Sequence, residues 1–425
     1  MRNHAIESIK LHSPEAVLLY MPQLLEALKY EKQHDSALVA LILNYSNKSI
    51  RFAHSLYWHL REHISRSNEC ILLRYLMVSD ALLHLFNKAM VDEIKQEVLL
   101  VKLIDKIGDS VKKNKNTEFF LDELDKLNRE WPLKKSNNQE ISCRLPYNIS
   151  HCSKEIDVKL CSIISSFTMP LKLVFKNIDP TANSFYTIYK IGDDLRQDMF
   201  VLQLINVMNE LWLSEDVDLH ILTFTCLQTE NKRGFIQMIT NAETLKEIQK
   251  GDVINAFKKN CINDWLKIHN PNNFKKAIEN FTKSCAAYSL ATYILGIGDR
   301  HNDNIMVKYT GHMFHIDFGK YLGDVQTFAG IKRDRTPILF TSDMFYVICQ
   351  SKEPNEKFQE FIELCCKAFQ ILRKNYNHLL TLIDLMINSN IPGLNRNAIQ
   401  YVYKNLMIEQ SEDEASNNLK KSFFF

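Results

Sequence analysis

The residues best suited to chemistry lie between positions 296 and 320, where the sequence reads GIGDRHNDNIMVKYTGHMFHIDFGK. Asp317 and Asn304 carry the hard oxygen ligands that Mg²⁺ prefers. Asp299 precedes Asn304 by five residues in a polar loop. His301 adds a titratable side chain that can take a proton from a hydroxyl group near neutral pH. The apolar runs on either side of Tyr-Thr-Gly predict a hairpin that joins the polar loop to Asp317. Together these residues indicate phosphoryl transfer from ATP.

A cation must also hold the phosphates that are not transferred, and Lys190 is the candidate. Lys190 ends a strand-like run and directly precedes Ile191 and the segment GDDLRQD at 192–198. Asp198 lies one helical turn after Asp194 and therefore faces the same side, where it can steady Lys190 or the metal site. D-F-G alone is a weak signal that chance also produces, but the loop, the hairpin and D-F-G together indicate a kinase.

Glycine usage separates this chain from common nucleotide binders. It has 11 glycines, only Gly108 falls in the first 191 residues, and six lie within one 35-residue window that begins at Gly296. Neither G-x-x-x-x-G-K-[ST] nor G-x-G-x-x-G occurs, which excludes a Walker-A ATPase and an ordinary protein kinase. The loop Ser165–Pro170 must therefore bind phosphate through hydroxyls and backbone N–H groups.

Composition limits the class of protein further. Lys plus Arg (52) almost balances Asp plus Glu (50), so a globally basic nucleic-acid binder is not expected, although a local basic patch stays open. The N-terminus has no signal-peptide core, and the longest uncharged run, Cys285–Gly298, is too short to span a bilayer. We expect no nucleic-acid partner and no transmembrane segment. The scattered cysteines predict reduced thiols in a cytoplasmic protein.

The apolar periodicity predicts an α+β protein with a helical solenoid first. Short amphipathic helices are expected after the Ser13-Pro14 cap and near Ser36, Ile50, Cys70 and Val91, and the lysine run 111–117 is expected to be a solvated turn. Strands are predicted at 171–175, 185–189, 219–224 and 234–239, with a helix from about Asp194 to Leu213. The predicted domains are a helical accessory domain (1–132), a linker (133–150), a small antiparallel-sheet lobe (151–241) and a mostly helical lobe (242–425) with a shortened C-terminal helix.

On GDDLRQD and the block from GDRHNDN to HIDFG, the chain resembles the phosphoinositide 3-kinase family. The resemblance covers nearly the whole chain and implies a helical accessory domain followed by a bilobal, protein-kinase-like domain. It implies that Asp299 and His301 form the catalytic loop, with His301 as the base. It also implies that Asn304 and Asp317 bind Mg²⁺. The ATP site that it implies consists of Ser166, Lys190, Asp198 and a hinge at Gln237, Met238 and Ile239.

Within that family the activation loop is similar to class II. Lys320 follows D-F-G where class I has a second histidine, and the first basic box of class I is replaced by Val-Gln-Thr-Phe at 325–328. The second basic box remains and contains Lys332, Arg333 and Arg335. Losing one cationic cluster removes partners for a second ring phosphate. The resemblance therefore implies phosphatidylinositol and its 4-phosphate as substrates, with the 4,5-bisphosphate poor.

The expected activity is transfer of the ATP γ-phosphate to the inositol 3-hydroxyl, with ATP and Mg²⁺ as cofactors, for signalling and membrane trafficking. Expected partners are phosphoinositide lipids at a membrane surface and a regulatory or recruiting protein, at an endosomal or plasma membrane. We expect the chain to lack the lipid-binding modules of class II and the first helices of the helical domain, and whether it is a whole protein or a fragment stays open. For the last phenylalanines, a frayed tail is favoured over insertion at a membrane interface. Two alternatives remain open: a truncated, catalytically impaired scaffold, and a related serine/threonine protein kinase.

Overall fold

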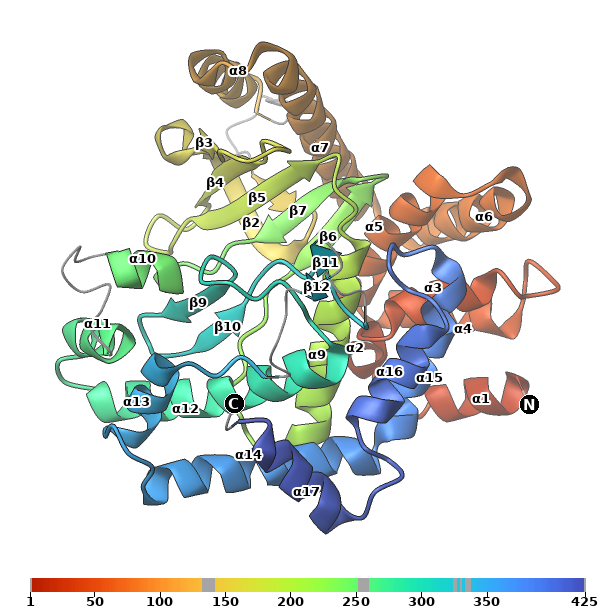
Figure 1. The fold of residues 1–425 in the computed structure, drawn as a ribbon. Helices are drawn as coiled ribbons and strands as arrows, with labels where there is room; N and C mark the ends of the chain where they lie inside the picture. The colour runs from red at the N-terminus through yellow and green to blue at the C-terminus, as the bar shows by residue number, and fades with distance from the viewer. Residues whose placement is uncertain are drawn as a thin grey trace. The chain divides into compact units, whose positions relative to one another are not determined.

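The chain forms two compact units, whose elements are drawn in Figure 1. The structure is a computed structural model that describes residues 2–131, 142–250, 260–323, 327–328, 331–332 and 338–423. One unit comprises Met1–Met199 and Phe224–Met238, and the other comprises Phe200–Thr223 and Ile239–Phe425. The predicted class is confirmed, because a helical region precedes a domain with an antiparallel sheet and further helices. In the described part of the chain, no helix is both long and apolar enough to cross a bilayer.

The first unit begins with the accessory helices. They are α1 (Arg2–Ile9), α2 (Pro14–Leu18), α3 (Met21–Leu28), α4 (Ala37–Lys48), α5 (Ile50–Arg66), α6 (Glu69–Leu85), α7 (Lys88–Asn114) and α8 (Thr117–Arg129). Side chains of Ser13, Ser36, Ser49, Asn87 and Asn116 accept backbone N–H groups and cap the helices that follow them. The predicted helix starts are correct to within three residues. The expectation of short helices fails at α7, which has 27 residues and incorporates much of the lysine run that was predicted to be a turn.

The strands of the first unit form one antiparallel sheet. They are β1 (Cys143–Leu145), β2 (Asn148–Ile156), β3 (Ser162–Ile163), β4 (Leu171–Asn177), β5 (Phe185–Ile191), β6 (Cys226–Glu230) and β7 (Arg233–Gln237), with the 3-10 helix η1 (Val158–Leu160) before β3. Their order is β1-β2-β4-β5-β7-β6, with β3 paired to β4. The prediction of a strand at 219–224 is wrong, because that segment is irregular and the next strand, β6, begins at Cys226. β1 and the start of β2 fall inside the segment that was predicted to be a linker.

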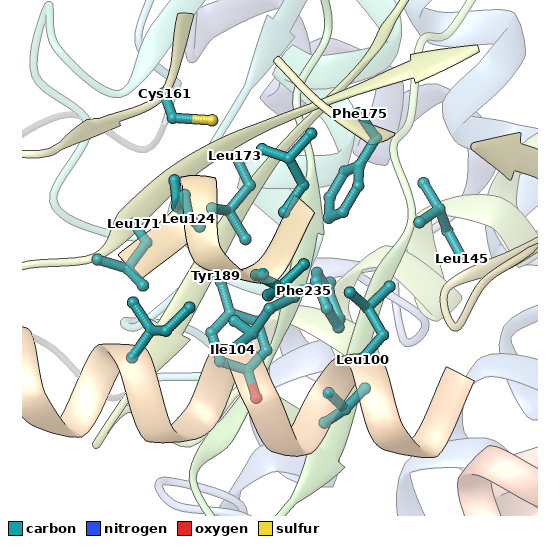
Figure 2. Close-up of a cluster of buried hydrophobic side chains, with 14 of the residues drawn as sticks. Leu100, Ile104, Leu124, Leu145, Cys161, Leu171, Leu173, Phe175, Tyr189 and Phe235 are labelled. Carbon is teal, nitrogen blue, oxygen red and sulfur yellow. The ribbon is translucent and has the colours of Figure 1, made fainter. Parts of the chain in front are cut away.

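The last two accessory helices, α7 and α8, share one hydrophobic core with the sheet, whereas α1–α6 bury a second cluster of their own. Figure 2 shows Leu100 and Ile104 of α7 beside Leu173 of β4, Tyr189 of β5 and Phe235 of β7. All of these side chains are buried. Because a sheet face and a helix stripe must each cover apolar surface, the long helix α7 and the sheet stabilise one another. Of the helices before α7, α5 adds Trp58 to this core.

The second unit is built around a buried helix. Its helices are α10 (Leu245–Lys250), α11 (Cys261–His269), α12 (Phe274–Leu295), α13 (Ser342–Cys349), α14 (Glu356–Lys374), α15 (Tyr376–Met386), α16 (Asn397–Asn405) and α17 (Glu412–Lys421), with η2 (Ile387–Ser389). It also contains most of α9 (Arg196–Leu213) and the strands β8 (Ala242–Thr244), β9 (Ile305–Lys308), β10 (Met313–His315), β11 (Thr327–Phe328) and β12 (Ile331–Lys332). α12 is buried along its second half and ends at Gly296, which has a left-handed φ of 55° and leaves room for the ring of Tyr401.

The end of the described chain packs into an aromatic cluster. The Phe423 ring lies 5.6 Å from the rings of both Phe340 and Phe361, at nearly perpendicular angles. Phe423 is buried, so the expectation of a frayed tail is wrong for this residue. Phe424 and Phe425 lie outside the described residues.

Charged side chains of α3 and α5 form a buried cluster in the first unit. His63 Nδ1 lies 2.9 Å from Glu62, and its Nε2 lies 3.4 Å from Glu26. Lys29 and Arg66 also pair with these carboxylates. Burial acts to raise the pKa values of Glu26 and Glu62, but the cations and hydrogen bonds around them lower both to about 2. Burial acts to lower the pKa of His63, but the two carboxylates raise it above 6.5.

This cluster predicts a pH-dependent stability. A raised folded pKa means that His63 contributes stability below about pH 6.5 and loses it as pH rises through the folded value. We expect His63→Gln to cost roughly 3 kcal/mol of unfolding free energy at pH 6, as for a broken buried ion pair, and clearly less at pH 9. Denaturant unfolding of both proteins at the two pH values measures the difference.

The matched control is His34→Gln, because His34 is exposed. This variant should change stability little at either pH. An equal cost of His63→Gln at pH 6 and pH 9 would show that His63 is uncharged in the folded protein.

Candidate active site

Lys190 lies on β5, on the face of the sheet opposite to the shared core. Burial alternates along the strand, with Thr187, Tyr189 and Ile191 buried and the residues between them only half-buried. The Lys190 ammonium lies 3.7 Å from Asp193 Oδ2, in the turn that follows the strand. The same Asp193 oxygen accepts a hydrogen bond of 3.2 Å from Thr168 Oγ1. Asp193 therefore connects Lys190 to the loop that precedes β4.

That loop, residues 164–170, joins β3 to β4 and contains Ser166. Its ends are tied by the Ile164 N–H, which donates to the Pro170 carbonyl at 2.9 Å. Ser166 is exposed, and its carbonyl accepts a bond from the Met169 N–H at 3.3 Å. A short hairpin loop with exposed hydroxyls and no charged side chain fits the predicted glycine-free phosphate loop.

Asp198 and Lys190 both act on the charge state of Cys226 in the first unit. Asp198 is buried in the first turn of α9. Burial raises the pKa of the Cys226 thiol well above its usual value, the Asp198 charge raises it further, and the Lys190 charge lowers it. Both charged groups therefore lie close enough to Cys226 to act on it. Sequence reasoning did not single out Cys226, since nothing in its spacing marks it.

The predicted hinge follows β7. The Gln237 N–H donates to the Thr225 carbonyl at 2.8 Å, and the Met238 N–H donates to the Tyr186 carbonyl at 2.9 Å. The next backbone N–H, that of Ile239, donates to no residue in the ranges that the structure covers. A backbone donor at the end of a strand, without an intramolecular acceptor, is suited to bind the edge of a purine base.

In the second unit, β9 and β10 pair as the predicted hairpin and place Asn304 beside the D-F-G segment. The Ile316 N–H donates to the Asn304 carbonyl at 3.0 Å. The Asn304 amide nitrogen donates to the Asp299 carbonyl at 3.0 Å and lies 3.2 Å from His301 Nε2. Because the amide nitrogen is used in this way, the Asn304 side-chain oxygen is left for an outside ligand.

β10 is anchored on the buried helix α12. The Met313 N–H donates to Ser284 Oγ at 2.9 Å, and the His315 ring stacks on Tyr288 with centroids 5.1 Å apart. Burial lowers the pKa of His315 well below 6.5, and the nearby Arg300 charge acts in the same direction. His315 is therefore neutral near pH 7 and serves as part of the core that positions Asp317.

Two of the predicted catalytic aspartates have unusual backbone conformations. Asp299 has φ of 57° and Asp317 has φ of 61°, in the left-handed region that residues other than glycine rarely adopt. Such conformations persist only where neighbouring structure holds them, and they often occur at functional sites. Asp317 is exposed, and its side-chain Oδ1 accepts a long hydrogen bond, 3.4 Å, from the Gly319 N–H.

Arg300 holds the two segments together. Its Nε donates to the Gly298 carbonyl and its Nη1 to the Ile316 carbonyl, each at 2.8 Å, and its Nη2 donates to the Asp317 carbonyl. The guanidinium also lies over the Phe318 ring, 5.9 Å from the centroid. The planar, multidentate guanidinium suits this fork of carbonyls better than an ammonium would. Sequence reasoning assigned Arg300 no role, because its carbonyl partners become neighbours only after folding.

The donor set is consistent with a divalent cation shared with a phosphate ligand. Among the described residues, no group of three or more His, Cys, Asp or Glu side chains could hold a metal alone. Mg²⁺ seldom uses such an all-protein cage: it binds one or two carboxylates together with waters and substrate phosphates. Asp317 with the Asn304 oxygen is a donor set of this kind.

The activation segment is described only in part. The Lys320 carbonyl accepts a hydrogen bond of 3.0 Å from the Gly298 N–H, which ties this segment to the start of the catalytic loop. The backbone of Lys332 pairs with Thr327 between β12 and β11. Arg333 and Arg335 lie outside the described residues, as do 324–326.

Two protein families match this chain. The family described as "Phosphatidylinositol 3- and 4-kinase" matches residues 184–396, which include Lys190, Asp299, Asn304 and Asp317. The family described as "Phosphoinositide 3-kinase family, accessory domain (PIK domain)" matches residues 1–95.

Curated relatives extend the similarity over almost the whole chain. The human "Phosphatidylinositol 3-kinase C2 domain-containing subunit gamma" is 40% identical over 99% of this chain and 28% of its own length. The human "Phosphatidylinositol 4-phosphate 3-kinase C2 domain-containing subunit beta" is 40% identical over 98% of the chain and 25% of its own length. "Phosphatidylinositol 3-kinase 3" of Dictyostelium discoideum is 36% identical over 99% of this chain and 25% of its own length. The chain thus spans about a quarter of these relatives, and it belongs to the phosphatidylinositol 3- and 4-kinase family.

Proposed function

We propose that this chain is the catalytic region of a class II phosphoinositide 3-kinase. It would transfer the γ-phosphate of ATP to the 3-hydroxyl of phosphatidylinositol and of phosphatidylinositol 4-phosphate. The observation that carries the proposal is the arrangement of Asn304, His301 and Asp317, with ligand oxygens and an imidazole on two segments that Arg300 ties together. Family membership supports a lipid kinase.

The first unit would supply the cation and the loop that bind the phosphates of ATP. In the first unit, Lys190 would contact the phosphates, Asp198 would steady it, and Ser166 would offer its hydroxyl and the loop backbone. The hinge backbone at Gln237, Met238 and Ile239 would bind adenine. The Asp193 carboxylate supports the Lys190 role, because an ion pair fixes a flexible ammonium in one direction.

In the second unit, His301 would accept the proton of the attacking inositol hydroxyl, with Asp299 beside it in the catalytic loop. The His301 Nε2 lies 4.0 Å from Asp299 Oδ2, which places both side chains in the same catalytic loop. Asn304 and Asp317 would hold Mg²⁺, which when bound neutralises charge on the transferring phosphoryl group.

Lipid choice would be decided by the activation segment. Lys320, Lys332, Arg333 and Arg335 supply cationic charge for the headgroup, whereas 325–328 supplies none. One cationic cluster can pair with one ring phosphate, which favours the 4-phosphate over the 4,5-bisphosphate. The names of the relatives, one a phosphatidylinositol 3-kinase and one a phosphatidylinositol 4-phosphate 3-kinase, are in keeping with both substrates.

The first test is a vesicle assay with Mg-ATP and each of the three lipids. We expect 3-phosphorylated products from phosphatidylinositol and its 4-phosphate, and a loss of at least about 100-fold in Lys190→Met and Asp317→Ala, because each removes charge stabilisation of the transferring group. Lys154→Met and Asp384→Ala remove the same charges elsewhere and should stay active.

Three results would contradict parts of the proposal. No lipid product, together with no Mg²⁺-dependent stabilisation by ATP in a thermal shift, would favour the scaffold. Peptide phosphorylation without lipid phosphorylation would favour the protein kinase. Preference for the 4,5-bisphosphate would overturn the class II assignment alone.

A second prediction concerns Arg300. Arg300→Lys keeps the charge but loses the fork of donors, so the catalytic loop and Asp317 should no longer be held together. We expect kcat to fall by about 10- to 100-fold with a smaller change in the KM for ATP, because misplaced reacting groups slow the chemical step. Steady-state kinetics measure this split. Arg129→Lys, at an exposed position on α8, is the control.

A third prediction concerns the basic box. The triple variant Lys332→Ala, Arg333→Ala, Arg335→Ala should lose about tenfold or more activity on the 4-phosphate and change little on phosphatidylinositol, since a phosphate–cation contact is lost only in the first case. Initial rates on the two lipids give the ratio. Removing the exposed Lys352 and Lys357 should leave the ratio unchanged. Equal losses on both lipids would show that the box binds membrane rather than the ring phosphate.

A further inference from the structure

The C-terminal half of α7 lies directly against the strand that carries Lys190. Gly108, the lone glycine of the first 191 residues, marks the closest approach. A methyl group added at Gly108 would lie 2.1 Å from Ile191 Cδ1, so a larger residue would fit only if Ile191 changed rotamer within the core. An accessory helix therefore touches the residue next to the candidate ATP lysine.

Ionic hydrogen bonds add to this contact between α7 and the sheet. Asp105 accepts from the Tyr189 hydroxyl at 2.6 Å and from Arg233 Nη1 at 3.1 Å. Asp109, one turn later, accepts from both Arg233 terminal nitrogens at 3.1 and 3.0 Å. Arg233 pairs with Ile191 across β5 and β7. Two carboxylates of α7 are thus fixed to β5 and to its neighbouring strand β7.

Lys112, one turn beyond Asp109, contacts the turn itself. Its ammonium donates to the Ile191 carbonyl, and it lies 3.2 Å from where a Cβ at Gly192 would be. Gly192 has φ of 93°, a conformation that glycine adopts readily, and its N–H donates to the Lys232 carbonyl at 2.7 Å. The chain turns here from β5 into Asp193, so the Lys112 bond helps to set the direction in which Asp193 leaves the strand.

Asp193 connects this turn to the candidate ATP-binding residues. Its carboxylate is the group that lies 3.7 Å from the Lys190 ammonium and accepts from Thr168 of the phosphate loop. A change in the Ile191–Gly192 turn would therefore move the partner of Lys190 and the loop together. Phosphate binding depends on such groups being oriented before the ligand arrives.

We propose that Lys112 is a positioning residue for ATP. Through the Ile191 carbonyl it holds the turn that places Asp193, and Asp193 in turn orients Lys190 and the loop 164–170. The accessory helix α7 is then part of the nucleotide site without touching nucleotide. This inference rests on the proposed function, because it assumes that Lys190 contacts the ATP phosphates.

The experiment compares Lys112→Ala with Lys113→Ala in the whole chain. Lys113 is the neighbouring lysine on α7 and is exposed, so Lys113→Ala removes the same charge from the same helix. We expect Lys112→Ala to raise the KM for ATP by about tenfold, as for a lost charge-assisted hydrogen bond. Its KM for phosphatidylinositol should change less than about twofold. Lys113→Ala should match the unaltered protein, and Lys112→Arg, which can still donate to the carbonyl, should recover most of the ATP affinity.

A thermal shift with Mg-ATP and no lipid supplies the second readout. Lys112→Ala should need about tenfold more ATP for half of the maximal stabilisation. An unchanged KM for ATP with a lower melting temperature would overturn the proposal, since it would show a purely structural lysine. If Lys190→Met kept full activity, the proposed function itself would fail. If Lys190→Met were inactive while Lys112→Ala bound ATP normally, only the role of Lys112 would fail.

Discussion

The packing of α7 against the small sheet is the constraint on which the first unit depends. The same helix contributes Leu100 and Ile104 to the shared core and then Asp105, Asp109 and Lys112 to the end of β5. Apolar burial supplies most of the stabilisation but has no direction, whereas the ionic bonds have one. Apolar burial thus holds α7 against the sheet, and the ionic hydrogen bonds fix its orientation relative to β5. The position of Lys190 follows from both.

In the second unit, too, apolar packing brings the elements together and directional hydrogen bonds fix their orientation. Stacking of His315 on Tyr288 and burial of β10 against α12 bring the hairpin to its place. Arg300 then fixes the backbone carbonyls on either side of the catalytic loop and the D-F-G segment. The left-handed conformations of Asp299 and Asp317 cost free energy. Hydrogen bonds to their backbone carbonyls, from Asn304 to Asp299 and from Arg300 to Asp317, can offset that cost.

Two kinds of charged group therefore need to be distinguished in this chain. The candidate catalytic groups, such as Asp317 and His301, are exposed or bound only weakly within the protein. The buried set around His63, Glu26 and Glu62 is held by ion pairs, and its shifted pKa values reflect ion pairing in a low-dielectric interior. A strongly shifted pKa thus marks a structural cluster in this protein, whereas exposure and unused oxygens mark the candidate site.

Local sequence determined the helix starts, the β9–β10 hairpin and the residue types of the candidate site. Caps, apolar periodicity and turn residues act over a few positions, so they can be recognised without knowing the fold. The same rules failed at 219–224, where an apolar run is irregular, and at 111–117, where a lysine run continues a long helix. Only the tertiary structure decided what Gly108, Lys112 and Arg300 do. Their partners lie on other elements of the fold or are backbone carbonyls, which carry no side-chain signature in a sequence.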